Sequence, residues 1–175
     1  MTTLAPWAGW LVVALTIGLL VWAAWCDVAI RTIPDSASII LVLLGIAVRA
    51  DAGLVALATS TVVAASLFML LVFLHSRAIL GGGDVKLAAA IALGLSPLGT
   101  YRFLVVTSLA GGVLVLIHLC LRRIPSPPAP SRPARSLLGR IARAELWRVR
   151  RRGSLPYGVA IAFGGAWVAL TGPGG

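Results

Sequence analysis

Charged residues are scarce in this sequence: they make up 11% of its 175 residues, and only five of them are acidic. A soluble domain carries about 25% charged and about 45–50% apolar residues, whereas here the apolar classes reach 59%. The mean hydropathy is +1.01. This composition excludes a water-soluble globule and a disordered tail. It predicts one all-α membrane domain over residues 1–175, with about six transmembrane helices of about 20 residues each.

Cysteine and histidine are equally rare, with two of each. Cys26 and Cys120 form no C-x-x-C pair, so they cannot build a structural zinc site by themselves, and nothing in their spacing indicates a disulfide. A serine or cysteine hydrolase needs a histidine base, but His75 ends one apolar run and His118 lies within another. We therefore expect neither a metal nor a cofactor.

Six runs with few or no charges are candidates for membrane helices. They are Trp7–Trp25, Ser36–Val48, Ala52–Leu74, Leu87–Tyr101, Phe103–Leu121 and the segment from Gly153 to the C-terminus. The second and fourth runs are too short for a hydrocarbon core about 30 Å thick. Their polar flanks, Pro34–Asp35 and Gly83–Asp84, are therefore expected in the first turns of these two helices. Trp25 is too large for a signal cleavage site, so we expect the first run to be an uncleaved helix.

Basic residues are divided unequally between the two sides of such a six-helix topology. One side receives thirteen, namely Arg31, Arg77, Lys86 and the ten between Arg122 and Arg152, and the other receives only Arg49 and Arg102. Connections rich in Lys and Arg stay in the cytoplasm. We therefore expect a multi-pass protein of a bacterial or archaeal cytoplasmic membrane with both termini outside.

Residues 122–153 form a Pro- and Arg-rich loop before the last apolar run. Its first part, IPSPPAPSRP, is typical of a linker. The second part, SLLGRIARAELWRVRRRG, spaces its apolar residues as in a helix lying on a membrane surface, although a solvated tether fits it equally well. A basic block between apolar spans indicates contact with anionic lipid headgroups rather than nucleic acid.

The acidic residues carry the most information about function. They are Asp27, Asp35, Asp51, Asp84 and Glu145. Glu145 lies among arginines and Asp51 beside Arg49, so both are interpreted as surface residues. Asp35 follows Pro34 at the start of a helix, where a carboxylate can accept hydrogen bonds from free N–H groups, so helix capping is its first interpretation.

Asp27 and Asp84 differ, because each lies at the end of an apolar helix at membrane depth. A carboxylate there costs roughly 2.5–3.5 kcal/mol and usually faces a bundle interior where it has a function. The topology puts both on the cytoplasmic side, where two carboxylates can share a proton and activate water for attack on a carbonyl. The structural alternative is that Asp27 pairs with Arg31 and Asp84 with Lys86.

A glycine triplet, Gly81, Gly82 and Gly83, precedes Asp84. Backbone without side chains can approach a substrate strand closely and adopt positive φ, although such a triplet also fits a plain turn. Helix polarity separates the two carboxylates, because a helix start favours negative charge at Asp84 and a helix end disfavours it at Asp27. We therefore expect Asp27 to hold the shared proton.

Three stretches resemble the motifs of type IV prepilin peptidases, in the order in which those motifs occur. CDVAIRTIPD (Cys26–Asp35) resembles their D-x-x-x-R-x-I-P-N segment, and GGGDVKLAAAIALGL (Gly81–Leu95) their G-x-G-D-x-K-L segment. LPYGVAIAFGG (Leu155–Gly165) is similar to the P-Y-G-x-A-I-A-x-G start of their last helix. The resemblance covers nearly the whole chain except the loop Ile124–Arg152.

This resemblance implies a GxGD-type intramembrane aspartic endopeptidase with Asp27 and Asp84 as its catalytic pair. Such enzymes remove a short basic leader from prepilin-like proteins at the cytoplasmic membrane face. The chain lacks the two C-x-x-C pairs of larger members, so no methyltransferase activity is expected, and it is similar to the short peptidases of Flp (tight-adherence) pilus systems. Asp35 stands where the family more often has Asn, which makes it a rival of Asp27.

The remaining candidates belong to the same motifs. Gly81 to Gly83 are expected to line the substrate path, and Lys86 either steadies charge near Asp84 or extends to lipid headgroups. Pro34 and Tyr157 are secondary candidates at the starts of two helices. The alternative function is non-enzymatic: a small transporter or pilus-assembly subunit in which the two aspartates bind a proton or cation.

Overall fold

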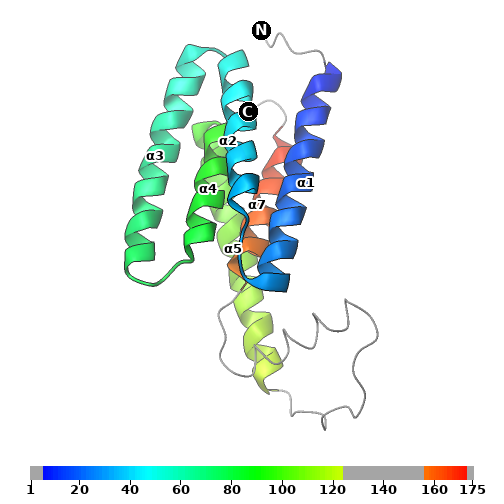
Figure 1. Cartoon of the computed structure of the whole chain (residues 1–175), viewed down its shortest axis with the longest axis vertical. Helices are drawn as coiled ribbons and strands as arrows, with labels where there is room; N and C mark the ends of the chain where they lie inside the picture. Colours follow the sequence, from blue (N-terminus) through cyan, green and yellow to red (C-terminus); the bar gives the residue numbers. More distant parts are fainter. Residues whose placement is uncertain (1–5, 124–155, 173–175) are drawn as a thin grey trace.

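The computed structural model describes residues 6–123 and 156–172, which form an all-α bundle. Its six helices are α1 (Pro6–Ile30), α2 (Asp35–Asp51), α3 (Leu54–Ser76), α4 (Gly82–Gly94), α5 (Pro97–Arg123) and α7 (Tyr157–Thr171). Figure 1 shows them side by side, with their direction alternating along the chain. The predicted all-α class is confirmed. Glu145 and the predicted linker and surface helix lie outside the described residues.

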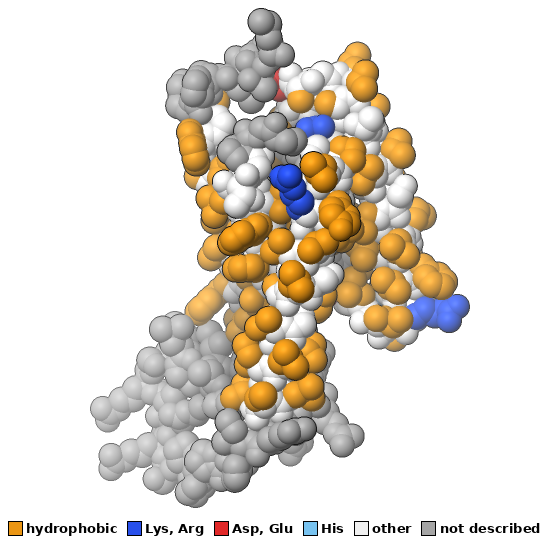
Figure 2. Space-filling model, turned by 180° about the vertical axis from the view of Figure 1, so that it is seen from behind, with side chains coloured by type: hydrophobic (Ala, Val, Ile, Leu, Met, Phe, Trp, Pro, Cys, Tyr) orange, Lys and Arg blue, Asp and Glu red, His pale blue; other side chains and the backbone are white. Residues whose placement is uncertain are grey.

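Three helices in the described ranges are long and apolar enough to cross a membrane: Ala8–Ile30, Leu54–Ser76 and Pro97–Leu121. A fourth, Tyr157–Thr171, is apolar but shorter. Figure 2 shows apolar side chains spread over one face of the bundle, with Lys and Arg at only a few points. A surface this apolar belongs in lipid, so the protein is a membrane protein. The number of six crossings stays a prediction.

The fourth apolar run, Leu87–Tyr101, does not form the single helix expected from the sequence. α4 ends at Gly94, Leu95 is extended with φ −102° and ψ 155°, and α5 begins at Pro97. Proline lacks an N–H and disfavours the α conformation of the residue before it, so a helix stops ahead of it and a new one begins with it. α4 keeps 13 residues, or about 20 Å at roughly 1.5 Å per residue.

This short helix, α4, is the centre of the bundle and packs against α2, α3 and α7. Leu87 and Ala92 are fully buried in it, and the surrounding core includes Leu20 of α1. α2 crosses α4 with almost no space between the backbones: a Cβ on Gly45 would lie 2.9 Å from the nitrogen of Gly94. Small residues permit such close approach of membrane helices, which fixes α2 relative to α4.

Five helix ends meet at one end of the bundle, because successive helices alternate in direction (Figure 1). These are the ends of α1 at Ile30 and α3 at Ser76, and the starts of α2 at Asp35, α4 at Gly82 and α7 at Tyr157. All the residues singled out in the sequence motifs belong to these helix ends or to the connections beside them.

Candidate active site

A polar pocket of about 240 Å³ lies at this end of the bundle. Its walls are the connection between α1 and α2 and the start of α4, through Asp27, Arg31, Thr32, Ile33, Asp35, Gly81, Gly82, Gly83, Asp84 and Lys86. Asp27 and Asp84 therefore border the same space although they are far apart in the sequence. They are close enough for the charge of Asp27 to act on the Asp84 carboxyl.

Asp27 lies in the last turn of α1 and is buried, with 8% of its surface exposed. The helix ends because Arg31 takes a left-handed φ of 58° and donates its backbone N–H to the Asp27 carbonyl at 3.1 Å. The Asp27 carboxylate is held from another direction: the backbone N–H of Gly158, in the first turn of α7, donates to Oδ2 at 2.9 Å. The last helix therefore fixes the position of this carboxylate.

Gly158 is a site residue that the sequence analysis did not single out. A Cβ at this position would lie 2.8 Å from Oδ2 and 3.0 Å from Cγ of Asp27, so any side chain would push the carboxylate away from the start of α7. The available signal was the P-Y-G motif, in which only Tyr157 was singled out as a candidate. Tyr157 instead packs its ring against α5, where a Cβ on Gly111 would lie 2.7 Å from it.

Asp84 lies in the first turn of α4, half-buried, and its carboxylate accepts a hydrogen bond from the backbone of Gly81. An acid in the first turn that bonds back to the N-cap residue is one half of a capping box. A Cβ on Gly81 would lie 2.9 Å from Asp84 Oδ2, and one on Gly83 would lie 3.1 Å from Cβ of Ile33. The glycines are thus needed for close packing around the carboxylate.

The backbone of the glycine triplet does not adopt the positive φ that glycine permits. Among the described residues, positive φ occurs at Arg31, Gly53 and Ala78, so Gly81, Gly82 and Gly83 all keep a negative φ. The turn before α4 is held by His75 of α3, whose Nδ1 lies 2.8 Å from the carbonyl oxygen of Leu80. Since a carbonyl only accepts, Nδ1 carries the proton in this contact.

Asp35 and Lys86 form an ion pair at the edge of the pocket, with 2.8 Å between Oδ1 and Nζ. Their side chains are 66% and 53% exposed. The expected capping role of Asp35 is wrong, because its carboxylate contacts Lys86 rather than the free N–H groups of α2, whose N-cap is Pro34. The alternative ion pair between Asp84 and Lys86 is not formed either, because Lys86 bonds to Asp35.

The arrangement suits hydrolysis by a pair of acids. Two carboxylates border one space large enough for water, and one of them, Asp27, is buried and fixed by a backbone N–H. Such a pair can remove a proton from water and donate one to a carbonyl. Within the described ranges, no three His, Cys, Asp or Glu residues are grouped so that they could hold a metal ion.

Comparison with known proteins adds independent information. The model of the type IV leader peptidase family matches residues 14–116, a range that includes α1 beyond its first turns, α2, α3, α4 and most of α5. No curated protein and no solved structure gives a significant match. The family match covers more than half of the 175 residues and confirms the resemblance found in the motifs. The chain therefore belongs to the type IV leader peptidase family and is a membrane peptidase.

Proposed function

We propose that this protein is an aspartic endopeptidase that cuts the leader peptide from prepilin-like proteins at the cytoplasmic face of the membrane. One observation carries the proposal: Asp27 and Asp84, from two helices that are not neighbours in sequence, border a single polar pocket. Asp35 is the weaker candidate for the pair, because its carboxylate is exposed and neutralised by Lys86.

In the proposed mechanism, a water between Asp27 and Asp84 attacks the scissile carbonyl. One carboxylate takes a proton from the water, while the other, protonated, donates a hydrogen bond to the carbonyl oxygen. The hydroxide adds to the carbonyl carbon, and the proton taken from water then passes to the amide nitrogen, which leaves as an amine. No covalent enzyme intermediate is needed.

The roles of the two carboxylates follow from their hydrogen bonds. From the sequence, the helix start at Asp84 and the helix end at Asp27 assigned the shared proton to Asp27. The N–H of Gly158 at the start of α7 removes the basis of that assignment, because Asp27 then also has a helix start and its N–H groups to stabilise a negative charge. We assign the role of base to Asp27, the more deeply buried carboxylate and the one that accepts an N–H from another helix, and the role of acid to Asp84. The pair titrates as a unit.

The substrate backbone is proposed to lie along Gly81, Gly82 and Gly83. These glycines border the pocket without side chains of their own, so an extended peptide can approach the backbone next to Asp84. Lys86 and Asp35 would flank the same path. Tyr157 and Pro34 act indirectly in this proposal, by fixing the starts of α7 and α2.

The membrane orientation is part of the same proposal. The pocket end of the bundle carries Arg31, Arg77 and Lys86, whereas Arg49 and Arg102 lie in the last turn of α2 and the first turns of α5, at the other end. Because Lys and Arg gather on the cytoplasmic side, the pocket faces the cytoplasm and both termini lie outside. The basic loop would then contact anionic headgroups on the same side.

Co-expression with a candidate prepilin tests this function. We expect a leader-sized mobility shift, a single new N-terminus on sequencing, and no N-methylation of the product. Asp27→Asn and Asp84→Asn are each expected to abolish the shift while the protein still inserts in the membrane. Asp51→Asn, at the other end of α2, is the matched control and keeps the activity. A prepilin left intact by the wild-type protein contradicts the proposal and favours a transport or assembly role.

A further inference from the structure

A second and larger hollow, which we call the side groove, opens between α2, α3 and α4. Its volume is about 560 Å³. Small side chains from all three helices line much of it: Ser38, Thr61, Ala64, Ala65, Ala89 and Ala90. The rest of its wall is apolar except for Asp35 and Lys86. A hollow of this kind at membrane depth is suited to an apolar occupant.

The side groove is continuous with the candidate active site, because Asp35 and Lys86 line both hollows. From this ion pair it extends along α4 as far as Leu93 and along α2 as far as Leu43. At roughly 1.5 Å per residue, the α4 wall from Lys86 is about 10 Å long, or about two helical turns. The groove therefore leads from the polar pocket into the apolar middle of the bundle.

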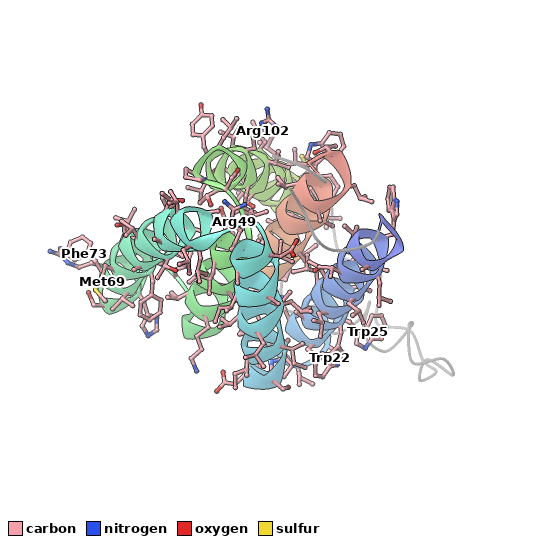
Figure 3. The ribbon with its side chains drawn as sticks, turned by 90° about the horizontal axis from the view of Figure 1, so that it is seen from above. Trp22, Trp25, Arg49, Met69, Phe73 and Arg102 are labelled. Atoms are coloured by element: carbon pink, nitrogen blue, oxygen red, sulfur yellow. The ribbon has the colours of Figure 1, made fainter. Side chains whose placement is uncertain are left out.

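The two faces of α3 differ in the size of their side chains. On its outer side, Met69 and Phe73 extend away from the other helices (Figure 3) and are 64% and 53% exposed. On the groove side, α3 contributes the small side chains of Thr61, Ala64 and Ala65 together with one large ring, Phe68. Bulky side chains suit contact with lipid tails, whereas small ones let another helix approach closely and pack against the backbone.

We propose that the side groove binds the apolar membrane helix of the substrate, directly beside the peptide bond that is cut. This inference rests on the proposed function, and the continuity of the two hollows supports it, because a chain that is cut at the polar pocket can extend from there into the groove. The Asp35–Lys86 pair marks where the bound chain passes from the polar pocket to the groove. A lipid acyl chain is the competing occupant, and the small lining residues favour a helix over it.

Filling the groove tests the proposal by activity. Ala65→Trp places a large ring among the lining residues, whereas Leu70→Trp adds one to a position on α3 that is 56% exposed and outside the groove. We expect Ala65→Trp to slow the cutting of a co-expressed membrane-anchored prepilin about tenfold or more, because the peptide can no longer align with the carboxylates. Leu70→Trp is expected to cut at the wild-type rate.

Photo-cross-linking identifies the occupant directly. Benzoylphenylalanine replaces Phe68, which lines the groove, or Phe73 on the outer side of α3 as the matched control. Both are made in an Asp84→Asn background, which keeps the prepilin uncut. We expect a cross-link to the apolar segment of the prepilin from position 68 and none from position 73.

The two proposals fail in different ways. If the wild-type protein cuts the prepilin, but Ala65→Trp cuts it equally fast, or position 68 cross-links only to lipid or no better than position 73, the groove proposal is overturned and the peptidase function stands. If the wild-type protein leaves the prepilin uncut, the proposed function itself is overturned.

Discussion

At the scale of single residues, the protein holds Asp27 and Asp84 in different ways. Asp27 is buried and bonded to a backbone N–H from another helix, whereas Asp84 is half-buried and bonded to the backbone of its own N-cap residue, Gly81. Fixed carboxylates matter for catalysis, because a displacement of about 1 Å can cost about 10²-fold in rate. Gly158 and Gly81 thus position the two acids of the proposed site.

Gly158→Ala tests whether the start of α7 positions the Asp27 carboxylate. The added Cβ would lie 2.8 Å from Oδ2, so the carboxylate must move, and we predict that cutting falls about 100-fold while membrane insertion persists. Alanine is the better helix former by about 1 kcal/mol, so a weakened α7 would not explain the loss. The matched control is Gly18→Ala in α1, where a Cβ meets nothing within 4 Å. Wild-type cutting by Gly158→Ala would contradict the positioning role.

Asp35→Asn tests which acid partners Asp84. An exposed ion pair such as Asp35–Lys86 contributes only about 0–1 kcal/mol, so we predict a reduction in cutting of less than about tenfold. Asp27→Asn is predicted to leave no detectable product. The measurement is the initial cleavage rate of purified variants. If Asp35→Asn instead left no detectable product and Asp27→Asn still cut, the catalytic role would belong to Asp35.

At the scale of helices, the proposed site depends on helix ends rather than on helix faces. Counting apolar runs was enough to place Asp27 and Asp84 on the same side, because each run reverses the direction of the chain. It could not place Gly158 against Asp27, since nothing local in the sequence fixes how α7 is rotated or how it approaches α1. The Asp35–Lys86 pair was missed for the same reason, because it depends on how closely α2 and α4 pack.

One helix boundary was available from the sequence but was not used. Pro97 interrupts the fourth apolar run, and counting charges alone extended that run to Tyr101. Pro97 disfavours the α conformation of Ser96, and this separates α4 from α5. An apolar run therefore defines a membrane helix only after prolines inside it have been considered.

The crossing of α2 and α4 carries a prediction about stability. A Cβ on Gly45 would lie 2.9 Å from the nitrogen of Gly94, so we predict that Gly45→Val destabilises the bundle by about 1–3 kcal/mol through overpacking. A lower thermal midpoint of the purified protein in detergent is the expected result. Gly112→Val is the matched control, because a Cβ there meets nothing within 4 Å. Equal midpoints for the two variants would disprove the close crossing.

At the scale of the whole molecule, the apolar surface and the distribution of basic residues together orient the site relative to the membrane. The apolar surface requires lipid, and the thirteen-to-two division of basic residues predicts which end faces the cytoplasm. The positions of the basic residues between the apolar runs were sufficient for this prediction, because it depends on the connection to which each residue belongs and not on any contact.

Cysteine labelling tests the orientation. In a protein whose Cys26 and Cys120 are replaced by Ser, Ser76→Cys marks the pocket end and Ala52→Cys the opposite end; both positions are exposed. The reagent is a membrane-impermeant maleimide, and it is added to intact cells that have no permeability barrier outside this membrane. We predict that it labels Cys at position 52 but not at position 76. Labelling of position 76 alone would place the pocket outside the cytoplasm.

The central claim is that Asp27 and Asp84 act together to split one peptide bond. Its most direct test is the cleavage rate of a purified prepilin by the wild-type protein, by Asp27→Asn, by Asp84→Asn and by the double variant. Residues that act as a unit are not additive, so we predict that each single variant loses all detectable cutting and that the double variant is no worse. Cutting that survives the loss of either carboxylate would contradict the account.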